Sequence, residues 1–267
     1  MIPASFVYHK AASLKEAVAL LAALPEAKLL AGGQSLIAAM KMRLARPSDV
    51  IDIAGLRDLS FVRRERDRLV IGALTTHHDV AVSADVQGAI PALAQLAEGI
   101  ADPAVRHMGT LGGSVANNDP AADYPAAVLA LGASVRTTRR TVAADAFFTG
   151  MFSTILEPDE IVTEIEFPIP ERAGYCKFRN PASRYAMPGV FVAAKGKGAR
   201  VAVTGAAPSV FRVVDMEAAL SRRFATDAIA DISVAVEDMT SDLHASAEYR
   251  AHLVTVMARR AIQAALG

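Results

Sequence analysis

Two short glycine-rich segments of the same design constrain this chain more than any other feature. Leu30-Ala31-Gly32-Gly33-Gln34-Ser35-Leu36 and Gly109-Thr110-Leu111-Gly112-Gly113-Ser114-Val115-Ala116 each place a glycine pair and a hydroxyl residue between apolar segments. Glycine lets the backbone approach a ligand closely and turn its amides outward, and amides exposed before a helix attract anions. Either segment alone is more often a tight turn. The pair predicts two loops that hold a pyrophosphate from both sides through backbone donors.

The region around the first glycine pair alternates between strand and helix patterns. Ser13-Leu14-Lys15-Glu16 has the form of a capping box, in which Glu16 reaches back to the free amides at a helix start. Apolar residues at helical spacing follow, and Pro25 ends the run. This order of strands and helices predicts a small parallel-sheet unit. The expected elements are a helix over 14–24, a strand over 28–31, a helix over 35–43 and a strand over 49–53.

The pattern changes after residue 55. Two apolar runs flank Glu65-Arg66-Asp67-Arg68 and predict a hairpin. Asp123 is expected to be the N-cap of a helix with Pro125 in its first turn, and Pro168, Pro170 and Gly174 predict a domain boundary. The expected domains are 1–55, 56–172 and 173–267. Further strands are expected over 59–64, 69–73, 134–138, 161–167, 175–178, 190–194 and 200–204, and helices over 92–100, 215–220 and 246–263.

A single cysteine, Cys176, limits the redox chemistry of this chain. It excludes an intrachain disulfide, and it excludes an iron–sulfur cluster or a zinc site built from several cysteines of this chain. Any redox function therefore needs a bound organic cofactor or a partner. The absence of intrachain disulfides also permits a cytoplasmic location.

Charge and hydropathy exclude two further classes of protein, general nucleic-acid binders and membrane-spanning proteins. Lys and Arg together number 28, as do Asp and Glu, so the basic excess of a general nucleic-acid binder is missing. The longest apolar stretch, over 17–24, stops at Pro25 and is too short to span a membrane. The N-terminus lacks the basic and apolar pattern of a secretory signal, so we expect a cytoplasmic protein.

Several common catalytic motifs are missing. The chain has no phosphate-binding P-loop, no complete Gly-x-Gly-x-x-Gly fingerprint after a strand and no Gly-x-Ser-x-Gly elbow. His77-His78-Asp79 suggests a metal site at first sight, but adjacent histidines on a strand point to opposite faces. We interpret this segment as a turn or a helix start. The sequence thus predicts no catalytic residues and no metal site.

The two glycine segments, together with Asn117-Asn118-Asp119-Pro120-Ala121-Ala122-Asp123, resemble those of the FAD-binding medium subunits of molybdenum hydroxylases, of the carbon monoxide dehydrogenase and xanthine dehydrogenase type. The C-terminal Lys177-Phe178, Ser183-Arg184-Tyr185-Ala186-Met187 and Ser246-Ala247-Glu248-Tyr249-Arg250 extend the resemblance over the whole chain. It implies an α+β fold. A two-part FAD-binding domain of the p-cresol methylhydroxylase or vanillyl-alcohol oxidase type would precede a C-terminal α+β domain of the CO dehydrogenase flavoprotein type.

The resemblance also implies a role for individual residues. Amides of the two glycine segments would hold the FAD pyrophosphate, Lys28 would contact the adenosine end, and Asp123 would bind ribityl hydroxyls. Tyr185 would cover one face of the isoalloxazine ring, although Ser183-Arg184 replaces the more usual Gly-Asp before it. FAD would lie extended between the first two domains, with its ring edge towards the third. The full expected set is Lys28, Ala31, Gly32, Gly33, Gln34, Ser35, Leu36, Ile100, Thr110, Leu111, Gly112, Gly113, Ser114, Asn117, Asp123, Ile161, Val162 and Tyr185.

The function implied is electron transfer within a larger enzyme. A large molybdenum-pterin (molybdopterin) subunit would oxidise the primary substrate, and electrons would cross the [2Fe-2S] clusters of a small iron–sulfur subunit to FAD on this chain. FAD would pass them to an external acceptor, and the complex would be a dimer of heterotrimers. The single Cys176 argues against an additional four-iron cluster here.

Two alternatives remain open at this point. The first is a stand-alone FAD oxidoreductase of the same flavin-binding superfamily, which would need a substrate acid that the sequence does not offer. The second is a non-catalytic scaffold whose glycine loops no longer bind flavin. A yellow purified protein would argue against the scaffold, and co-purification with iron and molybdenum subunits would argue against the stand-alone enzyme.

Overall fold

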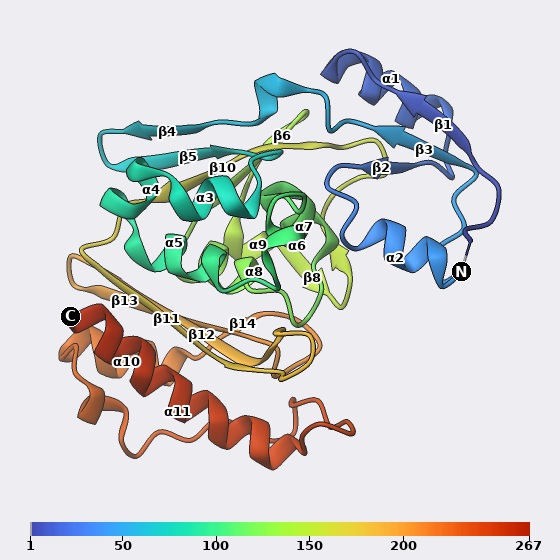
Figure 1. Ribbon diagram of the computed structural model, residues 1–267. Helices are drawn as coiled ribbons and strands as arrows, with labels where there is room; N and C mark the ends of the chain where they lie inside the picture. Colours follow the sequence, from blue (N-terminus) through green and yellow to red (C-terminus); the bar gives the residue numbers. More distant parts are fainter. Residues whose placement is uncertain (1) are drawn as a thin grey trace.

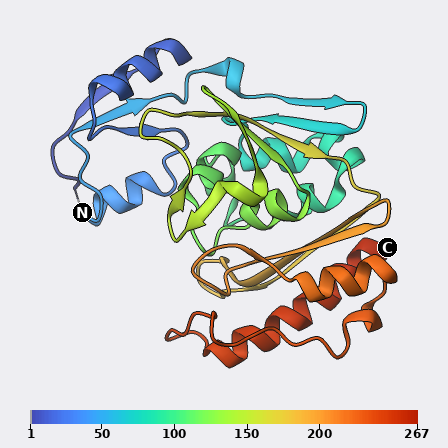
Figure 2. The ribbon, with the colours of Figure 1, turned by 180° about the vertical axis from the view of Figure 1, so that it is seen from behind.

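Separate sheets, rather than one continuous sheet, organise the chain. The computed structural model describes residues 2–267, and Figures 1 and 2 show the N-terminal part beside the central part, with the C-terminal part below the central part. The N-terminal sheet is parallel, in the order β1-β3-β2. This confirms the small parallel-sheet unit. Its elements are β1 (Val7–Lys10), α1 (Leu14–Ala23), β2 (Lys28–Leu30), α2 (Leu36–Lys41) and β3 (Asp49–Asp52).

The predicted capping box begins α1. Ser13 Oγ accepts a hydrogen bond from the Glu16 amide at 3.2 Å, and Glu16 Oε2 accepts one from the Ala12 amide at 2.8 Å. These bonds satisfy amides that the first turn leaves free. Ala17 and Leu21 of the same helix are buried against β3 and the neighbouring apolar residues. Local capping and burial therefore agree on where this helix begins.

The central sheet has the strand order β4-β5-β10-β6-β7, and each pairing along it is antiparallel. Leu69, Ile71, Ile165 and Phe167 from this sheet are fully buried beneath helices. The strands are β4 (Val62–Glu65), β5 (Arg68–Gly72), β6 (Ser134–Thr137), β7 (Thr141–Ala143) and β10 (Val162–Pro168). The helices are η1 (Arg57–Leu59), α3 (His77–Val82), α4 (Ala84–Ala89), α5 (Pro91–Glu98), α6 (Pro103–Arg106), α7 (Leu111–Asn117), α8 (Tyr124–Ala130) and α9 (Ala144–Phe147).

The C-terminal sheet lies between two helical layers (Figure 1). α5 and α8 pack on one side of it, and the long helix α11 packs along β11 and β12 on the other. Its elements are β11 (Arg172–Arg179), β12 (Ala186–Lys195), β13 (Gly198–Thr204), β14 (Phe211–Arg212), α10 (Val214–Arg222), η2 (Thr226–Ile229) and α11 (Ala247–Leu266). A short hairpin of β8 (Phe148–Gly150) and β9 (Ser153–Thr154) joins the central part.

One sequence expectation needs correction here, and another is confirmed. The sequence predicts Gly174 in a boundary segment, but Gly174 lies inside β11. A Cβ at this position would lie 2.0 Å from Ala261 O on α11. Glycine is therefore needed for close packing of a helix on a strand, rather than for a turn. His77 opens α3, with Thr76 as its N-cap, as the helix-start interpretation of His77-His78-Asp79 predicts.

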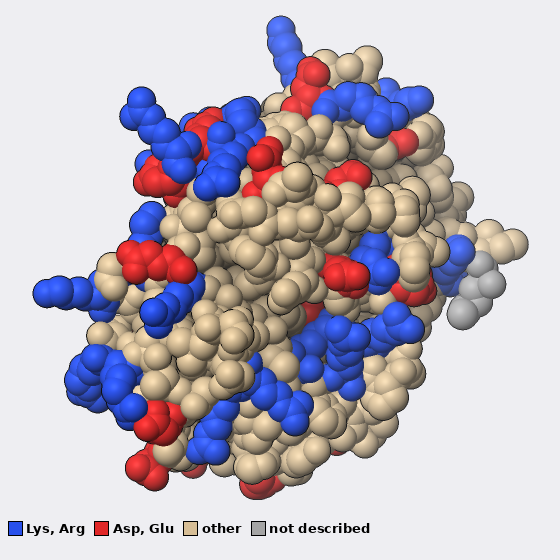
Figure 3. All heavy atoms as spheres, turned by 60° about the vertical axis from the view of Figure 1, so that its left-hand side comes forward, with Lys and Arg blue, Asp and Glu red and all other residues tan. Residues whose placement is uncertain are grey.

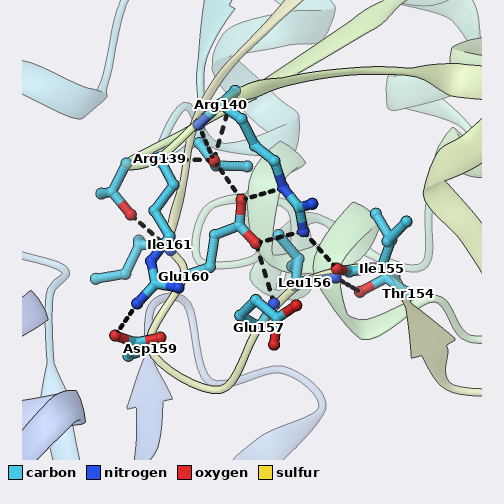
Figure 4. A network of polar contacts seen from close by, with 11 residues as sticks. Arg139, Arg140, Thr154, Ile155, Leu156, Glu157, Asp159, Glu160 and Ile161 are labelled. Carbon is cyan, nitrogen blue, oxygen red and sulfur yellow. Dashed lines mark hydrogen bonds and ion pairs between the residues drawn. The ribbon is translucent and has the colours of Figure 1, made fainter.

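A buried carboxylate fixes the segment that leads into β10 (Figure 4). Glu160 receives two hydrogen bonds of 3.0 Å from the Arg140 guanidinium group, one of 2.6 Å from Thr137 Oγ1 and one of 3.0 Å from the Glu157 amide. Arg140 also donates to Ile155 O at 2.8 Å. The network ties the β6–β7 turn to the residues that precede Ile161.

We expect this network to make the free energy of unfolding depend on pH in the acidic range. Burial by itself would raise the pKa of Glu160, but the bonds from Arg140, Glu157 and Thr137 hold that pKa at about 2, below its usual 4.5. The stabilisation is therefore complete above pH 4.5 and is lost as the pH falls towards 2. Allowing for solvent screening, the loss should be about 1–2 kcal/mol. Denaturant unfolding at several pH values should show a shallower acid loss in Glu160→Gln; equal slopes in both proteins would contradict the prediction.

Candidate cofactor-binding site

The fold brings the two glycine segments into direct contact, although nearly eighty positions separate them in the sequence. A Cβ on Gly32 would lie 1.9 Å from Met108 O and 2.8 Å from Gly109 Cα, so the first segment touches the start of the second. A Cβ on Gly113 would lie 3.9 Å from Ala31 Cβ. Figure 1 shows the β2–α2 connection beside α7. The N-terminal and central parts therefore meet at these two segments.

The first segment is an open row of backbone donors. Gly33 has φ of +71°, a left-handed conformation that glycine adopts without strain. Among residues 2–267, no acceptor pairs with the five consecutive amides of residues 32–36, and the first helical bond of this region runs from Ile37 N to Gly33 O at 3.1 Å. Consecutive unpaired amides in such a turn form an anion-binding concavity. The arrangement suits a pyrophosphate.

The second segment differs from its sequence-based description as a loop. Gly112 and Gly113 lie in the first turn of α7, for which Thr110 is the N-cap. Most of its amides are used inside the chain: Leu111 donates to Thr75 O, Gly112 to Ala73 O, and Gly113 and Ser114 to Thr110. The prediction of matched amide donors from both segments is therefore too symmetrical. The second segment offers instead an exposed glycine surface and the Ser114 hydroxyl, next to the amides of the first.

The three isoleucine and valine residues of the expected set, Ile100, Ile161 and Val162, lie in different environments. Ile161 is buried in the N-terminal cluster that also contains Leu29 and Ala31, next to the first glycine segment. Val162 is buried in the larger central core, away from that cluster. Ile100 is half-buried after α5. Of Ile161 and Val162, only Ile161 therefore belongs to the apolar cluster that includes Ala31 of the first segment.

The polar residues of the expected set border the same region. Lys28 is exposed at the start of β2, the strand that leads into the first glycine segment. Asn117 ends α7 and is half-buried. Sequence reasoning missed its neighbour Asn118, whose left-handed backbone ends α7 and whose buried amide group donates to Gly150 O and Ser153 O at 2.8 Å. The β8–β9 hairpin is therefore tied to the end of α7.

Asp123 is the N-terminal flanking residue of α8, but its side chain makes no capping bond, so the predicted capping role is wrong. The carboxylate is 4% exposed and points to β11. Its Oδ1 accepts a hydrogen bond from Tyr175 OH at 2.5 Å and lies 2.8 Å from Lys177 Nζ. Burial raises the pKa of Asp123, against the opposing influence of Lys177, Tyr175 and Arg179.

Lys177 and Tyr175 are partners of the candidate residue Asp123 that sequence reasoning did not assign. Both lie on β11, and the two-residue repeat of a strand puts them on one face. The Lys177 side chain is only 3% exposed, and within residues 2–267 its Nζ makes no well-aligned hydrogen bond besides the ion pair with Asp123. A lysine and a tyrosine two positions apart in a buried strand were the available signal. They join the C-terminal sheet to the start of α8.

Tyr185 lies on the β11–β12 connection and is 44% exposed. The amide of the next residue, Ala186, donates to Ala121 O at 3.4 Å, so Tyr185 lies near the Asp119–Asp123 segment. Burial, together with Asp119 and Asp123, raises the pKa of Tyr185. The unusual Arg184 before it has φ of +62° and donates to Ala101 O at 3.2 Å. The connection that carries Tyr185 is thus held against the residue that follows Ile100.

Comparisons with known proteins match two family models to successive parts of the chain. Residues 4–170 match a family described as the FAD binding domain in molybdopterin dehydrogenase. Residues 180–265 match the CO dehydrogenase flavoprotein C-terminal domain.

Similar proteins cover the whole chain. The carbon monoxide dehydrogenase medium chain of Hydrogenophaga pseudoflava is 38% identical over 285 residues, which cover 99% of this chain and 98% of that protein. The nicotine 6-hydroxylase medium subunit of Paenarthrobacter nicotinovorans is 35% identical, over 96% and 95% of the two chains. Among solved structures, a chain of quinoline 2-oxidoreductase from Pseudomonas putida 86 superposes with a TM-score of 0.90 at 29% identity, covering 100% of this chain and 99% of that chain.

Proposed function

The chain belongs to the family of FAD-binding medium subunits of molybdenum hydroxylases, and we propose that it transfers electrons through FAD from the two-iron clusters of a small subunit to an external acceptor. It is an oxidoreductase subunit with the α+β fold that the sequence predicts: an FAD-binding domain and a CO dehydrogenase flavoprotein C-terminal domain. No helix in the described part of the chain has the length and apolar character needed to cross a membrane.

One observation supports the cofactor position above all others: the five unpaired amides of residues 32–36 lie where the first glycine segment touches the second. A pyrophosphate needs several donors that converge, and backbone amides supply them without a counter-charge. The close packing at Gly32 and the exposed surface at Gly113 leave no side chain between the segments. The residues present therefore fit FAD.

The remaining candidate residues would orient the rest of the cofactor. Ser35 and Ser114 would add hydroxyl donors beside the pyrophosphate, and Lys28 would lie at the adenosine end. Asp123, held by Lys177 and Tyr175, would accept hydrogen bonds from ribityl hydroxyls. Ile100, Ile161 and Tyr185 would give apolar contact and exclude water. FAD, when bound, accepts electrons singly or in pairs, and this chain binds and orients it.

The assembly proposal starts from the names of the relatives. They are called medium chains or medium subunits of dehydrogenases and hydroxylases, which implies further subunits. This chain has one cysteine, too few for an iron–sulfur relay of its own. We therefore place a molybdenum-pterin site on a large subunit and the two-iron clusters on a small subunit, in a dimer of heterotrimers.

The isolated chain should bind FAD, yet fail to oxidise any primary substrate of the complex. The purified subunit should be yellow, and anaerobic mixing with substrate and an artificial acceptor should leave the flavin oxidised. Adding the small and large subunits should restore flavin reduction. Stopped-flow absorbance of the flavin measures both states.

The same experiment tests the alternative. Rapid turnover by the single chain without metal would overturn the electron-transfer proposal and support a stand-alone flavoenzyme. A colourless protein that takes up no FAD on titration would support the scaffold instead.

A further inference from the structure

The N-terminal part carries an apolar cavity, which borders the first glycine segment at Leu30. It has a volume of about 220 Å³, and its lining, which includes Phe6, Ile37, Met40 and Val50, is entirely apolar. It lies between α2 and the sheet of β1, β2 and β3. A volume of this size accommodates one large apolar side chain.

Exposed apolar side chains line this cavity or directly follow α2 in the chain. Phe6 is 40% exposed and Tyr8 53%, and the end of α2 adds Met42 at 59% and Leu44 at 77%. Together with Ile37, which is 40% exposed, these residues are here called the α2 surface. A group of large apolar side chains beside an open apolar cavity marks an interaction surface, whereas single exposed apolar residues do not.

Three basic residues lie at the end of α2, and the Asp52 carboxylate accepts a hydrogen bond from Tyr8 OH at 2.5 Å. Lys41, Arg43 and Arg46 are exposed and alternate with the apolar Met42 and Leu44. None of the three cations forms an ion pair with an acidic group of residues 2–267. Elsewhere some surface cations are paired, as in Arg63–Glu65, and the upper part of the face in Figure 3 shows Lys and Arg beside Asp and Glu, whereas its lower part shows mostly Lys and Arg. The α2 surface therefore favours an acidic partner.

We propose that the α2 surface docks another subunit of the complex, which inserts an apolar side chain flanked by carboxylates into the cavity. This inference rests on the proposed function, because it needs a heteromeric assembly. A second copy of this chain fits less well, since a twofold contact would place each basic rim against its own copy. Carboxylates on the partner would pair with Lys41, Arg43 and Arg46 while its apolar side chain fills the cavity.

The test variants must leave the cofactor site intact. Leu30 and Ile37 are unsuitable, because both lie within 3.2 Å of the position that a Cβ on Gly33 would take. Leu44→Glu changes an exposed position outside that contact and adds a charge where we expect carboxylates. Val214→Glu is the matched control, because Val214 is 67% exposed at the start of α10 in the C-terminal part.

The experiment measures assembly of the full chain with its large and small subunits by size-exclusion chromatography and by titration. Leu44→Glu should weaken subunit association at least tenfold while retaining its FAD, and Val214→Glu should match the wild type. A Lys41→Glu/Arg46→Glu variant should lose most of the salt dependence of association.

Three outcomes separate the two proposals. If the wild type assembles and Leu44→Glu assembles equally well, the docking inference fails and the proposed function stands. If the wild type joins no other subunit, the proposed function fails and the inference with it. If the wild type forms a homodimer that Leu44→Glu abolishes, the occupant is a second copy and the inference of an acidic partner is overturned.

Discussion

Gly113→Val should abolish FAD binding while the chain stays folded. Gly113 is exposed in the first turn of α7, and its backbone does not need a left-handed conformation. A Cβ there would lie 2.7 Å from Thr110 Oγ1 and 3.9 Å from Ala31 Cβ, so the valine side chain would fill the space between the two glycine segments. Valine has a slightly higher intrinsic helix propensity than glycine, so the expected losses in the free energy of unfolding come from the disturbed cap, at about 1 kcal/mol. Those losses are small beside the loss of the pyrophosphate site.

Gly88→Val is the matched control for this variant. Gly88 is exposed within the short helix α4, and a Cβ there would approach only Arg64 Nη1, at 4.0 Å. Both variants carry the same change in a short helix, and only Gly113 borders the first glycine segment. Flavin absorbance per chain, with circular dichroism to monitor folding, should separate them. A full complement of flavin in Gly113→Val would remove this position from the site.

Local signals predict much of the fold. The capping box at Ser13 and the apolar spacing that follows place α1 correctly, because the hydrogen bonds and burial that define it lie within one helix and its neighbouring strand. The hairpin of β4 and β5 is confirmed for the same reason. Short elements such as α9 and the β8–β9 hairpin were missed, since they depend on distant partners such as Asn118.

The site itself shows where local reasoning ends. Residue type and spacing identify both glycine segments, but only the fold shows that Gly32 packs against Met108 and that the second segment has used most of its amides. The partners of Asp123 come from β11, some fifty positions away. An aspartate directly before a helix can serve either as a helix cap or as one partner of a buried ion pair. The sequence alone does not distinguish them, since the difference lies in a contact between distant elements.

Asp123→Ala should both weaken FAD binding and destabilise the flavin-free chain. Lys177 is 3% exposed, so removal of Asp123 leaves a buried ammonium group without its counter-charge. Breaking a buried pair in this way costs about 3–5 kcal/mol. If Asp123 accepts ribityl hydroxyl bonds, each is worth roughly 1.5–3 kcal/mol, so the Kd for FAD should rise at least about tenfold. Denaturant unfolding of the flavin-free protein and fluorescence titration with FAD measure the two effects separately.

A double variant tests whether the loss of FAD affinity in Asp123→Ala follows from the loss of stability. Asp123→Leu/Lys177→Met removes both charges and keeps apolar volume, and such replacements of buried pairs are often neutral or stabilising. The double variant should therefore recover most of the stability that Asp123→Ala loses, while its affinity for FAD stays low. Recovery of affinity together with stability would show that Asp123 acts on the cofactor only by holding α8 against β11. Recovery of stability alone would support a direct contact between the Asp123 carboxylate and FAD, because both variants lack that carboxylate.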